Sequence, residues 1–358
     1  MNDSERKSRF DSSEALQAYF LLGVSRTFAL TIPALPDKLR PAVSNGYLLC
    51  RIIDCIEDDS GLNLEQKKHF ATQFIRVVEG KEDASEFSCA LLPLLSDVTI
   101  PAEKKLIQYA PEVIKITHGF NAEQQGALLT CVQIMGEGMM HYQELDTSRG
   151  LQDMREVTRY CYYVAGVVGE MLTQLYCHYS SEIKIKQDVL MKLSTCFGEG
   201  LQMTNIIKDV WADQERGACW LPRAEFENYG FDLATLSPGT NSRAFTDGLN
   251  ELIGVAHQRL YEALDYTLMI PRHETGIRNF CLFAIGMALF TLRKIYKSKR
   301  FNSGQNIKIS RKTVKFIILL SRLSVRSNLA LRILFKIAAW GLPRSKKSCF
   351  IPSTVRGE

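Results

Sequence analysis

YLLCRIIDCIEDD, residues 47–59, places three acidic side chains at helical spacing behind a run of apolar residues. Asp54, Glu57 and Asp58 stand at positions i, i+3 and i+4, so an α-helix stacks their carboxylates on one face. Like charges this close repel each other, and a bound cation removes that cost. Because hard divalent cations prefer oxygen ligands, the spacing predicts a Mg²⁺ site on a helix.

A second acidic pair lies about 150 residues further on, in TNIIKDVWAD, residues 204–213. Asp209 and Asp213 are again four residues apart. Either run by itself is also compatible with a solvated helix face, but two such runs in apolar helical surroundings favour metal sites. Mg²⁺ binds a few carboxylates together with substrate phosphates, so two acidic helices predict a polyphosphate substrate.

Helical periodicity dominates the rest of the chain. Apolar residues recur at i, i+3, i+4 and i+7 in long segments, whereas period-two alternation is nearly missing. The fold class predicted is therefore all-α. Long helical segments occur at residues 14–30, 126–142, 157–179 and 242–264. Turn-forming residues predict breaks at 32–41, 58–63, 92–103, 215–233 and 236–242.

Composition predicts one catalytic domain, residues 1–312, and a basic C-terminal extension, residues 313–358. The chain has 358 residues, 46% of them hydrophobic, and no tract that resembles a linker. Ten cysteines without CxxC pairs indicate reduced thiols, and the N-terminus lacks the apolar core of a signal peptide. We therefore expect a cytoplasmic protein.

Six segments together resemble the squalene/phytoene synthase family. SRTFAL, YLLCRIIDCIEDD, MGEGM, YCYYVAGVVG, QMTNIIKDVWAD and FCLFAIGMALFTL follow in the family's order from residue 25 to about residue 292. The resemblance implies a single-domain isoprenoid-synthase bundle around a central apolar cavity. It also implies a prenyltransferase that condenses two farnesyl diphosphates head to head, through presqualene diphosphate, to squalene, with Mg²⁺ and NADPH as cofactors.

The same resemblance implies roles for individual residues. The metal ligands would be Asp54, Glu57, Asp58, Asp209 and Asp213, and the catalytic proton acceptor would be Tyr160. The substrate contacts would be Ser25, Arg26, Phe28, Arg51, Gln202, Asn205, Lys208 and Phe280. The cofactor phosphates would meet Arg26, Arg51, Lys208, Lys308 and Arg311. Each basic residue also fits a surface ion pair, and each aromatic residue also fits an ordinary core.

Three positions depart from the family pattern and leave alternatives open. Ala212 replaces a glutamate of the second acidic motif, Ala218 replaces an arginine, and Ser310 stands where an arginine belongs in the cofactor segment. An NADPH-independent dehydrosqualene or phytoene synthase therefore stays open, as does a catalytically silent scaffold of the same fold. The prenyl chain length and the oligomeric state stay open as well.

The tail is strongly basic. Residues 291–358 contain 17 Lys and Arg residues and one acidic residue, which gives them a net charge of +16. Because the whole chain has a net charge of +5, its first 290 residues carry −11. Residues 313–341 predict an amphipathic helix whose apolar runs are shorter than the roughly 18 residues needed to span a bilayer. Such a helix lies on the inner face of a membrane or packs on the bundle. No nucleic-acid-binding module is recognised, so we expect no nucleic-acid partner.

Overall fold

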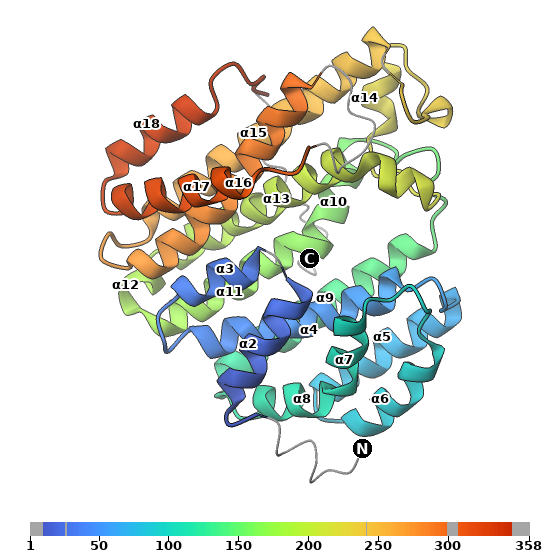
Figure 1. Cartoon of the computed structure of the whole chain (residues 1–358), viewed down its shortest axis with the longest axis vertical. Helices are drawn as coiled ribbons and strands as arrows, with labels where there is room; N and C mark the ends of the chain where they lie inside the picture. The colour runs from blue at the N-terminus through green and yellow to red at the C-terminus, as the bar shows by residue number, and fades with distance from the viewer. Residues whose placement is uncertain (1–9, 26, 241, 299–306, 346–358) are drawn as a thin grey trace. The chain divides into compact units, whose positions relative to one another are not determined.

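The computed structural model of the chain describes residues 10–25, 27–240, 242–298 and 307–345 (Figure 1). Within these ranges the backbone forms helices, turns and one isolated bridge between Leu151 and Pro222, and no β-strand. The prediction of an all-α fold is therefore confirmed. The chain divides into two compact units, which we call unit 1 (residues 1–144 and 174–184) and unit 2 (residues 145–173 and 185–358).

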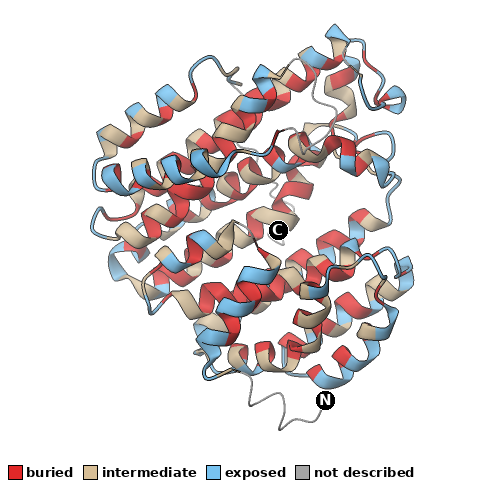
Figure 2. Cartoon of the chain, in the orientation of Figure 1, coloured by how far each residue is buried: buried red, intermediate tan, exposed pale blue. Residues whose placement is uncertain are grey.

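Unit 1 is built around helix α4, Arg40–Asp58, which packs against α2, α5, α7, α8 and α9. Its apolar side is fully buried, as at Leu48, Ile52 and Ile56 (Figure 2). The other elements of this unit are α2 Ser13–Val24, α3 Phe28–Thr31, η1 Ile32–Ala34, α5 Leu64–Val78, α6 Ala84–Leu91, η2 Leu92–Leu94, α7 Pro101–Gln108, α8 Ala110–His118, α9 Ala122–Gln143 and α12 Ser181–Lys184. Helix α11, Val167–Tyr179, runs from unit 2 into unit 1.

Local sequence signals explain where the helices of unit 1 begin. Asn63 and Asn121 each form a capping box, at the starts of α5 and α9, with a glutamine three residues later. Asp83 caps α6 by accepting hydrogen bonds from the backbone N–H groups of Ser85 and Glu86. The predicted breaks at residues 32–41, 58–63 and 92–103 coincide with the connections before α4, after α4 and before α7.

Unit 2 is organised by the long helix α13, Gln187–Glu215, which packs along α15, Arg243–Met269. The remaining elements are α10 Met154–Cys161, the π-helical turn η3 Tyr162–Gly166, α14 Arg223–Glu227, η4 Leu233–Thr235, α16 Thr275–Lys297, α17 Arg311–Ser324 and α18 Asn328–Ala338. Gly198 allows α13 to approach η3 closely, because a Cβ there would lie 2.3 Å from the carbonyl oxygen of Ala165.

A buried ion pair joins α13 to α15 in unit 2. Arg259 Nε lies 3.0 Å from Glu199 Oε2, and the two side chains are 3% and 1% exposed. Arg259 also pairs with Glu262 at 3.1 Å. Burial raises the pKa of Glu199 to about 8, and the charge of Arg259 acts in the opposite direction.

The tail forms two helices, so the prediction of one helix over residues 313–341 is wrong. Helix α17 ends at Ser324, and α18 begins after Ser327, whose side chain caps Ala330 N. Ile317 of α17 packs over Gly286 of α16, while the ring of Phe335 in α18 lies 5.9 Å from that of His257 in α15. The inner faces of both helices therefore pack on unit 2.

Helix α16 is, among the described residues, the one helix long and apolar enough to cross a membrane. Its apolar window is 67% buried, which a core helix also shows. Eight described cysteines are free thiols, as predicted.

Candidate functional site

The first acidic motif occupies the last two turns of α4 in unit 1. Asp54 and Glu57 are half-buried, while Asp58 is exposed and is the last residue of the helix. Gln143 of α9 donates a 2.6 Å hydrogen bond to Glu57 Oε1. The motif therefore lies at a helix end beside a loop, as its spacing and the turn after it predicted.

The carboxylates of this motif are held in an unfavourable electrostatic state. Loss of hydration raises the pKa of Asp54 to about 7, with further contributions from Asp58 and Glu103. Loss of hydration, followed by the charges of Asp58 and Asp54, raises the pKa of Glu57 to about 8. A divalent cation would reverse both effects, so the donor set fits Mg²⁺. Among the described residues no three acidic, His or Cys side chains converge closely enough to hold an ion as they stand.

Arg51 is shared between two carboxylates in unit 1. Its Nη1 lies 3.5 Å from Asp54 Oδ2, and its Nη2 pairs with Glu103 Oε1 of α7. Burial alone would lower the pKa of Arg51, but the charges of Asp54 and Glu103 raise it above its ordinary value. A permanently charged guanidinium, on a side chain that is 27% exposed beside the acidic face, is suited to bind phosphate oxygens.

The second acidic motif lies near the end of α13 in unit 2. Lys208 Nζ forms an ion pair with Asp209 Oδ2 at 3.0 Å, and it also donates a hydrogen bond to Asn205 Oδ1 at 3.0 Å. Gln202 accepts from Asn205 at 3.4 Å, which continues the polar row along the helix. Asp213 is buried and pairs with Arg216 at 2.6 Å. This motif therefore combines two carboxylates with two cations on one helix end.

Gly217 ends α13 in a Schellman motif. Its φ of +79° lies in the left-handed region, Gly217 N donates to Gln214 O, and Ala218 N donates to Asp213 O at 2.9 Å. Ala218, where the family pattern has arginine, thus contributes its backbone to the helix end. Ala212 precedes Asp213 on α13 and is exposed. Neither alanine has the charged side chain that the family pattern has at its position.

Tyr160 is fixed by an aromatic stack in unit 2. Its ring lies 4.0 Å from the ring of Trp220 with an interplanar angle of 3°, and Tyr160 is 7% exposed. Asp153 starts helix α10 by capping Arg155 N and Glu156 N. Backbone hydrogen bonds between Leu151 and the segment 221–223 bring Trp220 beside this helix. Tyr162 is also buried and donates to Glu170 at 3.2 Å.

The remaining predicted substrate contacts fall into both units. In unit 1, Ser25 is buried and accepts a 2.9 Å hydrogen bond from Phe28 N, and the Phe28 ring lies 5.1 Å from that of Tyr47. In unit 2, Phe280 is buried in α16. Arg26, predicted to contact both substrate and cofactor, lies outside the described residues.

The predicted cofactor segment begins α17 in unit 2. Ser310 is the N-cap of this helix and accepts a hydrogen bond from Thr313 N at 3.1 Å. Lys308 and Arg311 are exposed on either side of it, and the carbonyl of Lys308 accepts from Lys294 Nζ. The serine that departs from the family pattern therefore has a local structural role.

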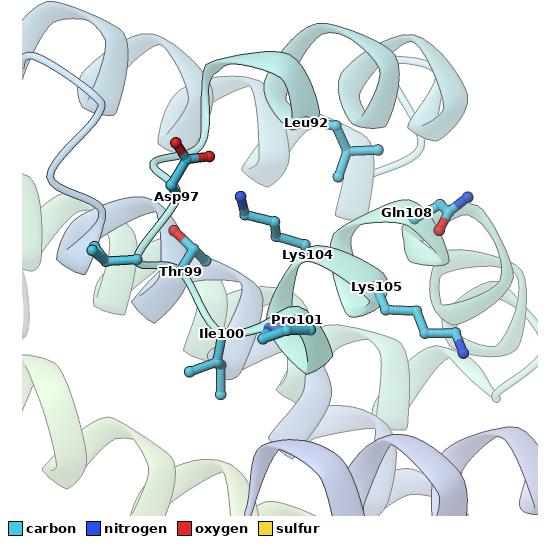
Figure 3. A pocket seen from close by; sticks show the side chains of 9 residues that line it. Leu92, Asp97, Thr99, Ile100, Pro101, Lys104, Lys105 and Gln108 are labelled. Carbon is cyan, nitrogen blue, oxygen red and sulfur yellow. The ribbon is translucent and has the colours of Figure 1, made fainter.

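Sequence reasoning missed several partners of the predicted residues. Glu103, Gln143 and Trp220 come from other segments, and no periodicity or spacing connects them to Arg51, Glu57 or Tyr160. A pocket of about 470 Å³ in unit 1 is formed by the loop before α7 and by α7 itself (Figure 3). None of the predicted site residues lines this pocket.

Comparisons with solved structures define the fold. A complex of TcSQS with the ligand BPH1237 superposes with a TM-score of 0.75 at 23% identity, covering 95% of this chain and 94% of the other. A dehydrosqualene synthase superposes with a TM-score of 0.62 at 18% identity, covering 88% and 97%. These likenesses show the fold, an all-α isoprenoid-synthase bundle of the squalene synthase type.

Sequence comparisons then identify the family. The profile described as squalene/phytoene synthase matches residues 21–313, and the chain belongs to this family. The squalene synthase of Cyberlindnera jadinii is 28% identical over 330 residues, covering 90% of this chain and 70% of the relative. The squalene synthase of Saccharomyces cerevisiae is 29% identical over 316 residues, covering 86% and 67%.

Proposed function

We propose that this enzyme condenses two molecules of farnesyl diphosphate head to head, in a Mg²⁺-dependent reaction, and reduces the product to squalene with NADPH. The observation that carries this proposal is the carboxylate face of α4, where Asp54, Glu57 and Asp58 lie beside Arg51. The relatives named squalene synthase support the substrate and the product.

The chemistry requires stabilisation of a leaving diphosphate. When bound, Mg²⁺ neutralises the negative charge that develops on this group. Asp54, Glu57 and Asp58 in unit 1, and Asp209 and Asp213 in unit 2, would supply the metal ligands. Arg51 and Lys208 would bind phosphate oxygens directly, because each already faces a carboxylate oxygen that a phosphate oxygen resembles in charge.

Formation of the cyclopropane intermediate requires loss of one proton. Tyr160 would relay it: the phenol oxygen takes the proton while its own O–H proton passes to the released diphosphate, and the stack on Trp220 holds the ring in place. Apolar and aromatic side chains such as Phe28 and Phe280 would keep water from the carbocation. Gln202 and Asn205 would place their amides near the metal ligands, because they share the polar row with Lys208.

NADPH would supply the hydride for the last step. Lys308 and Arg311 would bind its phosphates, because both side chains are exposed and lie at the start of a helix, where backbone N–H groups also favour anions. Arg51 and Lys208 are further candidates for such contacts. We expect Arg311 to take over part of the role of the missing arginine at Ser310.

Incubation of the enzyme with farnesyl diphosphate and Mg²⁺ tests the proposal. With NADPH we expect squalene, and without NADPH we expect presqualene diphosphate or unreduced C30 products, because only the reduction consumes hydride. Lipid analysis by mass spectrometry distinguishes these products. A C30 product that is the same with and without NADPH would favour a dehydrosqualene synthase. The solved structure of a dehydrosqualene synthase has the fold of this chain as well. No prenyl product at all would favour the silent scaffold.

We also propose that the tail places the enzyme on the inner face of a membrane. Six large apolar side chains of α17 and α18, together with Trp340 just after α18, are 48–79% exposed. They are Phe316, Leu319, Leu323, Leu329, Ile333, Ile337 and Trp340. Lys and Arg residues flank them, and residues 291–345 contain no acid. An apolar face bordered by cations is complementary to an anionic lipid surface.

Liposome flotation of the whole chain tests this contact. We expect co-flotation with vesicles that contain anionic lipid and little with purely zwitterionic vesicles, because each basic residue near the surface contributes about 1 kcal/mol. Replacing Leu323 and Trp340 by Ser should remove most of the binding. Replacing the exposed Leu22 of unit 1 by Ser is the control. Equal flotation of the tail variant and the wild type would contradict the proposal.

A further inference from the structure

Asp59 directly follows the first acidic motif, but its side chain has different hydrogen-bond partners from those of its neighbours. Helix α4 ends at Asp58, and Asp59 turns away in an extended conformation (φ −68°, ψ 124°) with only 5% of its surface exposed. Its Oδ1 accepts from Gly61 N at 2.7 Å and from Ser96 N at 3.1 Å. Its Oδ2 accepts from Ser96 N at 3.2 Å and from the hydroxyl of Thr99.

These contacts anchor the loop of residues 95–100 to the end of α4. Gly61 allows the close approach, since a Cβ there would lie 2.8 Å from Leu94 O and 2.9 Å from Ser96 N. On its other side the loop borders the open pocket of unit 1, where Thr99 and Ile100 line the wall (Figure 3). The carboxylate of Asp59 is therefore a principal attachment of the loop to the rest of unit 1.

The anchored loop leads into α7, whose first turn reaches back to the metal motif. Ile100 is the N-cap of α7 and Pro101 its first residue. Glu103, in the same turn, pairs with Arg51, whose other nitrogen lies 3.5 Å from Asp54. The loop before α7 is thus attached to Asp59, just after α4, and α7 itself contacts α4 through the pair of Glu103 with Arg51.

We propose that Asp59 is a positioning residue that holds Glu103 against Arg51, so that Arg51 is shared between Glu103 and Asp54. The competition from Glu103 keeps Arg51 from pairing fully with Asp54. Asp54 then remains available to a cation, and Arg51 to an anionic group. Asp59 itself is not a ligand, because both of its oxygens already accept hydrogen bonds. The inference rests on the proposed role of Asp54 in binding Mg²⁺.

Chemical modification of Arg51 tests the coupling without turnover. The whole chain is treated with phenylglyoxal, and the modification rate of Arg51 is followed by peptide mass spectrometry. Glu103→Gln defines the rate when the ion pair is lost. We expect Asp59→Asn and Thr99→Val each to change the modification rate of Arg51 in the same direction as Glu103→Gln does. The expected change is about 3-fold or more, which corresponds to the free energy of one hydrogen bond. The double variant Asp59→Asn/Glu103→Gln should match Glu103→Gln, because both changes break one pathway.

Asp83→Asn is the matched control, since Asp83 also accepts two backbone N–H bonds in unit 1, both from the first turn of its own helix α6. Thr99→Val removes a single hydroxyl and decides the question if Asp59→Asn does not fold. An Arg51 rate equal to wild type in both variants would overturn the inference and leave Asp59 a local cap.

The metal dependence separates this inference from the proposed function. We expect Asp59→Asn to raise the Mg²⁺ concentration for half-maximal thermal stabilisation about 3-fold or more, far less than Asp54→Asn does. Loss of Mg²⁺ stabilisation equal to that of Asp54→Asn, with an unchanged Arg51 rate, would make Asp59 a ligand and overturn the inference. A wild-type chain that makes no prenyl product, yet shows the Arg51 coupling, would refute the proposed function and leave the positioning contact standing.

Discussion

Asp54→Asn is expected to lower kcat/KM by about 10³-fold or more, with a nearly unchanged melting temperature. The amide removes a metal ligand and so removes transition-state stabilisation of the leaving diphosphate. The fold tolerates the change because Arg51 keeps its pair with Glu103, and because repulsion with Asp58 disappears. Asp209→Asn should act alike, since its exposed pair with Lys208 contributes only about 0–1 kcal/mol to stability.

Steady-state kinetics with farnesyl diphosphate, together with thermal unfolding, check this prediction. The matched control is Asp247→Asn on α15, which removes an exposed carboxylate that pairs with Arg243 at 3.7 Å. We expect its kcat/KM to equal that of the wild type. Retained turnover in Asp54→Asn or Asp209→Asn would refute the metal-ligand assignment of that residue.

Arg259→Ala is expected to lower the free energy of unfolding by about 3–5 kcal/mol, because it leaves the carboxylate of Glu199 buried without its partner. The loss relative to the wild type should grow as pH rises above about 8, where Glu199 ionises in the wild type but stays protonated without Arg259. The pKa of the Glu199 carboxyl is 4.5 in the unfolded chain and about 8 in the folded wild type, and it is higher without Arg259. A carboxyl with a raised folded pKa contributes its full stabilisation below the unfolded pKa and loses it as pH rises through the folded pKa. Urea unfolding between pH 5 and pH 9 measures the effect.

Two further variants separate charge burial from simple loss of packing. Glu199→Gln in the Arg259→Ala background should recover about 1 kcal/mol or more, since the neutral amide avoids the cost of burying a carboxyl that is ionised in the unfolded chain. Arg332→Ala is the control, because its 2.9 Å pair with Asp265 is partly exposed, at 43% and 31%. An Arg259→Ala variant no less stable than Arg332→Ala would show that the ion pair between α13 and α15 does not stabilise unit 2.

The elements of the candidate site were predictable wherever the signal was local. The spacing of Asp54, Glu57 and Asp58 predicts one helical face, and α4 has it. Arg51 lies three residues before Asp54, and the structure shows the ion pair that this spacing allows. Glu103 was not predictable, because it reaches Arg51 from another helix, 52 residues away. Long-range pairs of this kind depend on how helices pack and leave no periodic trace in the sequence.

In the tail, the surface pattern was predicted correctly, but the helix boundaries were not. Its charge and amphipathic pattern are evident in the sequence, and the exposed apolar faces of α17 and α18 agree with that pattern. Its division into two helices was missed. Ser327 caps α18 and Ser324 Oγ bonds back to Leu320 O, so two serines within an otherwise continuous helical pattern end one helix and begin the next.

The sequence by itself determined the helical class, the family and the placement of acidic residues on two helices, because all three depend on residue type at short spacing. The i+4 spacing already placed Asp58, and not Asp59, on the acidic face, but only the tertiary structure showed what the adjacent and chemically identical Asp59 contacts. The helix ends between them, so one carboxylate stays on the acidic face and the other turns into the loop before α7. Backbone direction at a helix end depends on the hydrogen bonds available there, and distant residues supply them.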